Sequence, residues 1–467
     1  MTTARIKNAW QFFREALAGD TELNYTEGSI ARVTVLLAIP MILEMAMESI
    51  FAVVDIFFVA GLGTEAVATV GLTEAVITLL YAVAIGLSMG ATAMVARRIG
   101  EKDREAASLA AGQALWVGLF VSLVVGLTGI LFAPDILRLM GAEAAVIDIG
   151  VNYTRIMFGG SFSIVFLFLV NAIFRGAGDA NLAMRALILA NGINIALDPC
   201  LIYGWGPFPE LGVTGAAVAT NTGRSIGILY GLYYLCGGGG RIRLQLQDMA
   251  LKLGLAWALV RISLGGVAQY LVATASWVFL VQIVADFGSA AVAGYTISVR
   301  IILFLILPVW GLGNASATLV GQNLGAGMPE RAETTVWFIA RYGSVYMALT
   351  ATALWLFARD IALWFTTEPE TVAYAVQSMR ILSYGFVFWG FGIAVTQAFN
   401  GAGDTMTPTW INVFCFWVVQ VPMAYVLALM LGIGPAGVFW AVFVSDMLIG
   451  IVGVLLFRRG TWKQRLV

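Results

Sequence analysis

Twelve long apolar segments, separated by short polar breaks, constrain this chain more than any other feature of its sequence. Each holds about 20 or more mostly apolar residues, the length that a helix needs to cross a bilayer. We therefore expect an all-α integral membrane protein with twelve transmembrane helices. The segments lie near residues 31–59, 66–96, 106–133, 146–174, 182–203, 213–236, 253–285, 291–320, 332–358, 371–399, 407–431 and 435–457.

The composition supports this class of protein and excludes others. Of the 467 residues, 60% are hydrophobic and 11% are charged, whereas a soluble domain carries about 25% charged residues. The net charge of −1 gives no reason to expect a nucleic-acid partner. The chain has no histidine, which excludes histidine acid–base chemistry and histidine metal sites. Cys200, Cys236 and Cys415 are scattered and form neither a disulfide framework nor a metal motif.

The distribution of Lys and Arg predicts how the chain is oriented in the membrane. Both chain ends and the loops after segments 2, 4, 6 and 8 are basic, whereas the loops after odd-numbered segments hold only Arg138 and Arg359. By the positive-inside rule, both termini are predicted to be cytoplasmic. The first thirty residues, which include Arg5, Lys7 and Trp10, lack the apolar core of a secretory signal. We expect an amphipathic helix there, lying in the membrane interface.

The second half of the chain repeats the first at one constant shift in residue number. This shift aligns Gly63 with Gly288, and F-R-G-A-G-D at 174–179 with F-N-G-A-G-D at 399–404. The same shift holds from residue 63 to residue 179 of the first half. It predicts two six-helix lobes, related by a pseudo-two-fold axis along the membrane normal. The predicted parts are a cytoplasmic or interfacial N-terminus at 1–30, an N-lobe at 31–236, a cytoplasmic inter-lobe loop at 237–252, a C-lobe at 253–458 and a cytoplasmic tail at 459–467.

The two Gly-Ala-Gly-Asp stretches fall at breaks between apolar segments. They lack the strand-turn-helix context of a phosphate-binding loop, and no Gly-Lys-Ser/Thr sequence follows them. We interpret them as tight cytoplasmic turns in which Asp179 and Asp404 cap the next helix. Direct contact of these aspartates with a ligand is the alternative.

The first apolar segment carries acids that are costly to bury. A helix turns by about 100° per residue, so Glu44, Glu48 and Asp55 fall within about 40° of one another. A charge at the bilayer centre costs at least about 2.5–3.5 kcal/mol, so this stripe is predicted to face protein or water. Pro40 precedes the stripe and removes one backbone hydrogen bond, which predicts a kink.

Further oxygen groups of the first half can accompany these acids. Carboxylate, amide and hydroxyl oxygens are ligands that hard cations such as Na⁺ prefer, and two close carboxylates can also share a proton. The alternative is that these groups only hydrogen-bond helices to one another. We expect H⁺ or Na⁺ coupling at Asp55, Tyr153, Asn171, Asn194, Asp198 and Thr220, with a candidate Na⁺ site at Asp55, Asn194, Asp198 and Thr220.

The acids are not repeated in the second half of the chain. The constant shift places Leu280 opposite Asp55 and Met423 opposite Asp198. Because the scaffold is duplicated and the acids are not, we expect the ion chemistry in the N-lobe. Glu44 and Glu48 are candidate cavity charges. We interpret the remaining isolated charges as interhelical pairing or snorkelling groups: Glu74, Arg155, Arg224, Arg300 and Asp446.

Over nearly its full length the chain resembles the multidrug and toxic compound extrusion (MATE) transporters, in particular prokaryotic members with an N-lobe aspartate and proline pattern. The resemblance rests on the two halves, the paired R/N-G-A-G-D stretches, Asp198-Pro199 followed by G-W-G-P and G-A-A-V-A-T, and Pro40 with Asp55 fifteen residues later. It implies an antiporter that exports cationic, amphipathic organic compounds in exchange for H⁺ or Na⁺ by alternating access. The first helix would bend at Pro40. The positions that match the family's coupling site are Pro40, Asp55, Tyr153, Asn171, Asn194, Asp198 and Thr220.

The resemblance also bounds what else to expect. A second branch of the family has a C-lobe cation site, but here the seventh segment offers Gln269 and Gln282, and the core of the tenth has no acid. We expect a monomer in the cell inner membrane, with no cofactor and no enzymatic activity. Its partners would be small cationic molecules and the lipid bilayer. The alternatives are a flippase for a lipid or lipid-linked oligosaccharide, which would need a more basic cavity, and a membrane enzyme, which would need an interfacial catalytic cluster.

Overall fold

The structure of the chain, a computed structural model, describes residues 11–19, 23–237 and 239–465, apart from the side chains of residues 52, 53 and 56. Within these ranges it consists of helices and turns, with no β-strand. The N-lobe comprises α2 (Ile30–Ala60), α3 (Thr64–Gly100), α4 (Arg104–Leu139), α5 (Ala144–Gly159), α6 (Ser161–Ala177), α7 (Ala180–Tyr203) and α8 (Val213–Gly237). The C-lobe comprises α9 (Leu253–Ala285), α10 (Ser289–Gly325), α11 (Pro329–Leu363), α12 (Pro369–Ser383), α13 (Phe386–Gly401), α14 (Met406–Asn412), η2 (Val413–Gln420), α15 (Val421–Tyr425), η3 (Val426–Met430) and α16 (Pro435–Arg458). Two short 3₁₀ helices, η1 (Leu246–Met249) and η4 (Thr461–Gln464), follow the lobes.

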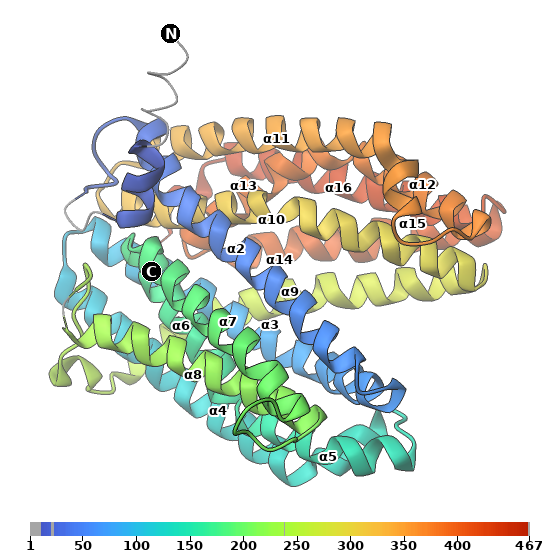
Figure 1. Cartoon of the computed structure of the whole chain (residues 1–467). Helices are drawn as coiled ribbons and strands as arrows, with labels where there is room; N and C mark the ends of the chain where they lie inside the picture. Colours follow the sequence, from blue (N-terminus) through green and yellow to red (C-terminus); the bar gives the residue numbers. More distant parts are fainter. Residues whose placement is uncertain (1–10, 20–22, 238, 466–467) are drawn as a thin grey trace.

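These helices confirm the membrane-spanning fold. Among the described residues, ten helical segments are long and apolar enough to cross a membrane, and the bent pair α12 and α13 adds an eleventh. α8, which has 25 residues, occupies the position of the sixth predicted span. Figure 1 shows the two lobes meeting at one end of the molecule and diverging toward the other. We call the end where they meet, which carries the 239–252 segment, the closed end.

Two of the predicted spans are interrupted by a turn, although the fourth still forms one apolar span of 34 residues. The fourth is divided between α5 and α6 at Gly160, and the tenth between α12 and α13, which are bent by 56°. The break is duplicated, because the constant shift of the repeat places Gly385 opposite Gly160. Glycine is a poor helix former, and in the N-lobe Asn221 of α8 supplies an outside donor to the Ile156 carbonyl of the last turn of α5 (2.9 Å). Apolar pattern alone does not reveal such a break.

The Gly-Ala-Gly-Asp stretches are tight turns, as predicted. Gly178 and Gly403 both adopt positive φ, at 91° and 82°, a conformation that side chains other than glycine seldom tolerate. The predicted capping role of Asp179 is wrong. Its side chain makes no capping hydrogen bond to α7; it accepts one from the backbone N–H of Arg241 (2.6 Å) and pairs with the Arg241 guanidinium (3.3 Å).

The lobes are tightly packed where α3 and α10 cross at the closed end. A Cβ atom on Gly100 would lie 2.0 Å from the Gln322 carbonyl oxygen, and one on Gly325 would lie 2.1 Å from the Arg97 carbonyl oxygen. The Gln322 amide also donates to the Gly176 carbonyl of α6 (2.9 Å). Backbone contact between the lobes at this crossing therefore depends on two glycines.

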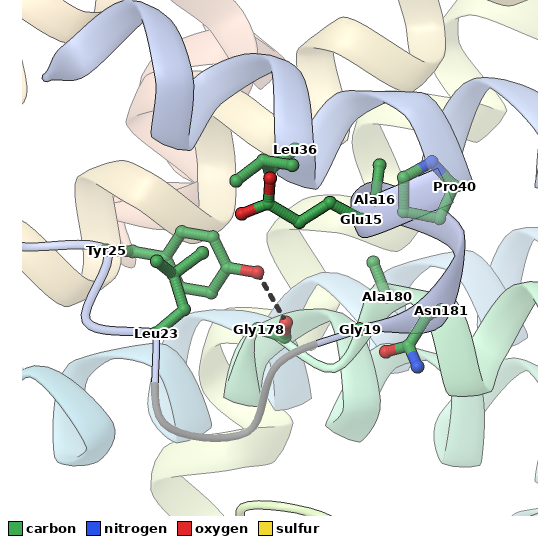
Figure 2. A pocket seen from close by; sticks show the side chains of 10 residues that line it. All are labelled: Glu15, Ala16, Gly19, Leu23, Tyr25, Leu36, Pro40, Gly178, Ala180 and Asn181. Carbon is green, nitrogen blue, oxygen red and sulfur yellow. Dashed lines mark hydrogen bonds between the residues drawn. The ribbon is translucent and has the colours of Figure 1, made fainter. Parts of the chain in front are cut away.

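The described part of the N-terminal segment packs on the protein. Residues 11–18 are helical, and Figure 2 shows Glu15 and Ala16 beside Leu36 and Pro40 of α2. A cavity of about 10 Å³ lies among these residues, which is about the space of one water molecule. Pro40 has no N–H, so the carbonyl of Leu36 lacks its helical donor here. Arg5, Lys7 and Trp10, which helped to predict an interfacial helix, lie outside the described residues.

Candidate ion-coupling site

Three helices of the N-lobe bring four of the predicted coupling residues together. Asp55 lies near the end of α2, Asn194 and Asp198 lie one turn apart on α7, and Thr220 lies on α8. All four are buried, and Asp198 is fully inaccessible. The Asn194 amide donates to the Asp198 carboxylate and to the Thr220 hydroxyl, both at 3.2 Å. Asp55 joins this network through the Thr220 hydroxyl and through its charge interaction with Asp198.

Two side chains of α7 hydrogen-bond to the backbone of α2, one on each side of Asp55. On one side, the Asn191 amide donates to the Met47 carbonyl (3.0 Å). On the other side, the Tyr203 hydroxyl donates to the Phe58 carbonyl (2.5 Å). These side chains bond backbone atoms, so the position of Asp55 relative to α7 depends little on neighbouring side-chain rotamers. The bonds fix the register of the two helices around Asp55.

The network leaves acceptor oxygens unused. Asp55 Oδ1, Asn194 Oδ1 and Asp198 Oδ2 are buried and have no hydrogen-bond partner among the described residues. Buried polar atoms normally find a partner, and carboxylate and amide oxygens are ligands that hard cations accept. The donor set therefore fits a bound hard cation or a proton. It does not fit a transition metal, because the described residues contain no cluster of three or more His, Cys, Asp or Glu side chains.

The structure separates the two other predicted coupling residues. Tyr153 of α5 is buried and lies within electrostatic reach of Asp55. Asn171 of α6 does not hydrogen-bond to any of the four residues at the Asp55 site. Its amide donates to the Glu44 carboxylate (3.3 Å), toward the closed end of α2. The sequence placed both on one span, but it could not show which acid each one meets.

Glu44 belongs to a second buried cluster. Its carboxylate forms an ion pair with Arg175 of α6, with an N–O distance of 2.5 Å and only 3% and 11% exposure of the two side chains. The Arg175 carbonyl in turn accepts a hydrogen bond from Thr318 of α10 (3.1 Å). Glu44 thus lies in a chain of contacts that reaches the C-lobe. From the sequence, Arg175 was counted only as one of the basic residues in the loop after the fourth segment.

A third polar cluster is built around Arg224, for which interhelical pairing or snorkelling was predicted but no partner was named. Arg224 of α8 is 6% exposed and donates to the Tyr81 hydroxyl of α3 (2.6 Å). Its charge also interacts with Glu48 and Asp55 of α2. The signals in the sequence were the charge of Arg224 inside an apolar span and its spacing from Thr220, which places both on one face of a helix. Of the other isolated charges, Glu74, Arg155 and Arg300 are exposed, and Asp446 is partly buried next to Trp389.

The chain is similar in sequence and in structure to known membrane proteins. The MatE family matches residues 40–200 and 267–426, more than half of the chain. The chain is 28% identical to the "Probable multidrug resistance protein YoeA" of Bacillus subtilis, over 94% of this chain and 95% of that protein. Two solved structures superpose with TM-scores of 0.87: "MATE in the straight conformation", at 30% identity over 93% of this chain and 97% of that one, and "MATE in the bent conformation", at 29% identity over 95% and 97%.

Two helical lobes that span the membrane, with a buried polar site in the first, define a multi-pass membrane transporter. The two stretches that match the family lie one in each lobe. The chain belongs to the MatE family.

Proposed function

We propose that this protein is a multidrug efflux antiporter, which exports cationic, amphipathic organic compounds in exchange for H⁺ or Na⁺. The observation that carries the proposal is the buried network of Asp55, Asn194, Asp198 and Thr220, with three unused acceptor oxygens. Two carboxylates within electrostatic reach of each other are costly to bury without a bound cation or proton. The name of the Bacillus subtilis relative supports the drug-like substrate class.

The transport cycle follows from this charge balance. With the closed end toward the cytoplasm, the N-lobe takes up H⁺ or Na⁺ from outside at Asp55 and Asp198. Neutralising the site removes its attraction for a cationic substrate and favours bending of α2 at Pro40, so that the substrate leaves. Release of the ion to the cytoplasm resets the site. The membrane potential contributes about 2.3 kcal/mol per charge per 100 mV.

An efflux assay tests the proposal. Vesicles containing the protein are loaded with a fluorescent organic cation, and export is followed under a pH gradient alone and then a Na⁺ gradient alone. One gradient should drive export by the wild type, and Asp55→Asn should lose that export, because an amide cannot exchange a proton or balance a cation. Asp286→Asn is the matched control, since Asp286 is an exposed residue at the end of α9. Equal export by the wild type and Asp55→Asn under both gradients would refute the mechanism.

The flippase alternative is less well supported. Holding a lipid-linked phosphate requires basic groups that are free to bind it. The two buried N-lobe arginines are engaged: Arg175 is paired with Glu44, and Arg224 is bonded to Tyr81. The same vesicles can be assayed for movement of a fluorescent anionic phospholipid, which we expect to be no faster than in vesicles without protein.

A further inference from the structure

Arg224 connects three helices of the N-lobe from a buried position. It extends from α8, its Nη2 atom donates to the Tyr81 hydroxyl of α3 at 2.6 Å, and its guanidinium lies over the Tyr81 ring at 5.8 Å. The same guanidinium lies over the ring of Phe51, on α2, at 5.2 Å. A cation over an aromatic face is attracted to it, and more strongly when water is excluded. One side chain thus bonds α3 and holds α2.

The carboxylates around Arg224 lie mostly on α2. The charge of Arg224 interacts with Glu48 first and with Asp55 second, and Glu74 of α3 also lies within its field. An arginine stays charged in proteins, and a buried charge needs a counter-charge nearby. Among the described residues, Glu48 is attracted by the charge of Arg224 and repelled by that of Glu44 on its own helix. Arg224 therefore attracts Glu48 across the boundary between α2 and α8.

Arg224 and Asp55 each retain unused hydrogen-bonding capacity. The Nη1 atom of Arg224 and the Oδ1 atom of Asp55 are buried and have no hydrogen-bond partner within the described ranges. The two atoms belong to groups whose charges interact. The segment of α2 from Glu48 to Asp55 is thus held by charge and ring contacts rather than by a closed set of hydrogen bonds. Such a contact can be released and remade.

We propose that Arg224 is a positioning residue that keeps α2 straight beyond Pro40, by contacting the Phe51 ring and attracting the Glu48 carboxylate from α8. The inference rests on the proposed function in one respect, namely that α2 bends during transport. Bending at Pro40 carries Phe51 and Glu48 away from α8 and leaves a buried guanidinium without its counter-charge. The straight form is therefore favoured for as long as Arg224 keeps its charge and Glu48 keeps its own.

Distances between two spin labels test this role without any transport measurement. The labels are attached at Phe57→Cys on α2 and Leu229→Cys on α8, positions that are 72% and 64% exposed. The full-length protein, with its three native cysteines replaced by serine, is placed in lipid nanodiscs. We expect one dominant distance in this background. Arg224→Met, which removes the charge and keeps most of the bulk, should move population into a second distance.

Three further variants make the result specific. Glu48→Gln should shift the population in the same direction, and the double variant should shift it no further, because the two residues act through one contact. Arg300→Met, which removes an exposed arginine of α10, should leave the distribution unchanged. If Arg224→Met does not fold, Glu48→Gln carries the test, because it removes the counter-charge and leaves the arginine in place.

An unchanged distribution in both Arg224→Met and Glu48→Gln would overturn the inference. The outcome is independent of the efflux assay, since the spin-label experiment uses no gradient and no substrate. If neither gradient drives export by the wild type but the Arg224 and Glu48 variants shift the distance distribution, the antiport mechanism is rejected and the role of Arg224 is retained. If a gradient drives export by the wild type but the variants leave the distribution unchanged, the mechanism is retained and the role of Arg224 is rejected.

Discussion

Glu44 and Arg175 show how a single residue's role depends on its partner. As a member of an acidic stripe, Glu44 was a candidate cavity charge. In the structure its carboxylate is paired with Arg175 and accepts the Asn171 amide. Arg175 thus compensates the charge of Glu44, although Glu44 Oε2, like Asp55 Oδ1, has no hydrogen-bond partner in the described part of the chain.

Removing one partner of this pair should destabilise the protein strongly. Glu44→Gln leaves the Arg175 guanidinium buried and unbalanced, which costs about 3–5 kcal/mol in comparable cases. We expect a clear fall in the apparent melting temperature in detergent, measured by size-exclusion chromatography after heating. The double variant Glu44→Gln, Arg175→Met should recover part of the loss, because it removes both charges. A double variant less stable than either single one would contradict this account.

At the scale of elements, the crossing of α3 and α10 decides how closely the lobes meet. Thr318 and Gln322 of α10 donate to the backbone of α6 at Arg175 and Gly176. These bonds require the close approach that Gly100 and Gly325 permit. The closed end is thus held by backbone contacts, and a single methyl group can disturb it.

Gly100→Ala should loosen the closed end. The added Cβ would lie 2.0 Å from a backbone oxygen of α10, so the two helices must separate. We expect a cysteine at buried position Thr318→Cys to react faster with a small maleimide in this variant, in protein without native cysteines. Gly71→Ala on the same helix is the matched control, because a Cβ there has nothing within 4 Å. Equal labelling rates in the two variants would disprove the role of the crossing.

At the scale of the whole molecule, the repeat is structural but its two halves are not equivalent. Each Gly-Ala-Gly-Asp turn is paired with an arginine from the segment after its own lobe: Asp179 with Arg241, and Asp404 with Arg465, both at 3.3 Å. The side chain of Arg241 is 6% exposed and that of Arg465 is 56% exposed. Both halves keep the Asp–Arg contact, but the different burial of the two arginines should change how much each contact contributes to stability.

This asymmetry predicts unequal effects of equivalent substitutions. Arg241→Ala leaves Asp179 buried without its cationic partner and also removes the hydrogen bond to the Leu23 carbonyl (2.6 Å), so it should cost several kcal/mol. Arg465→Ala breaks a pair in which the arginine is exposed and Asp404 is buried, so its cost should be smaller than that of Arg241→Ala. Thermal stability of the two variants in detergent provides the measurement. Equal losses would show that exposure does not set the weight of the two contacts.

The sequence by itself predicted the spans, the two lobes and the polar residues that the structure brings together in the N-lobe. Apolar segments of membrane length and a constant shift between the two halves are properties of the chain order, so they can be read without coordinates. Asp55, Asn194 and Asp198 were found in the same way, because a charge or amide inside an apolar span is conspicuous, and Thr220 was added as a hydroxyl that matches the family pattern.

Only the tertiary structure decided which polar groups meet. Asn171 was assigned to Asp55 but bonds Glu44, and Arg224 was expected to pair between helices or to snorkel, without a named partner, and contacts α2 and α3. The breaks at Gly160 and Gly385, and the arginine partners of Asp179 and Asp404, were likewise absent from the sequence pattern. Helical periodicity fixes the face on which a side chain lies. Its partner depends on how two distant helices pack, and that depends on close contacts such as Gly100 against Gln322.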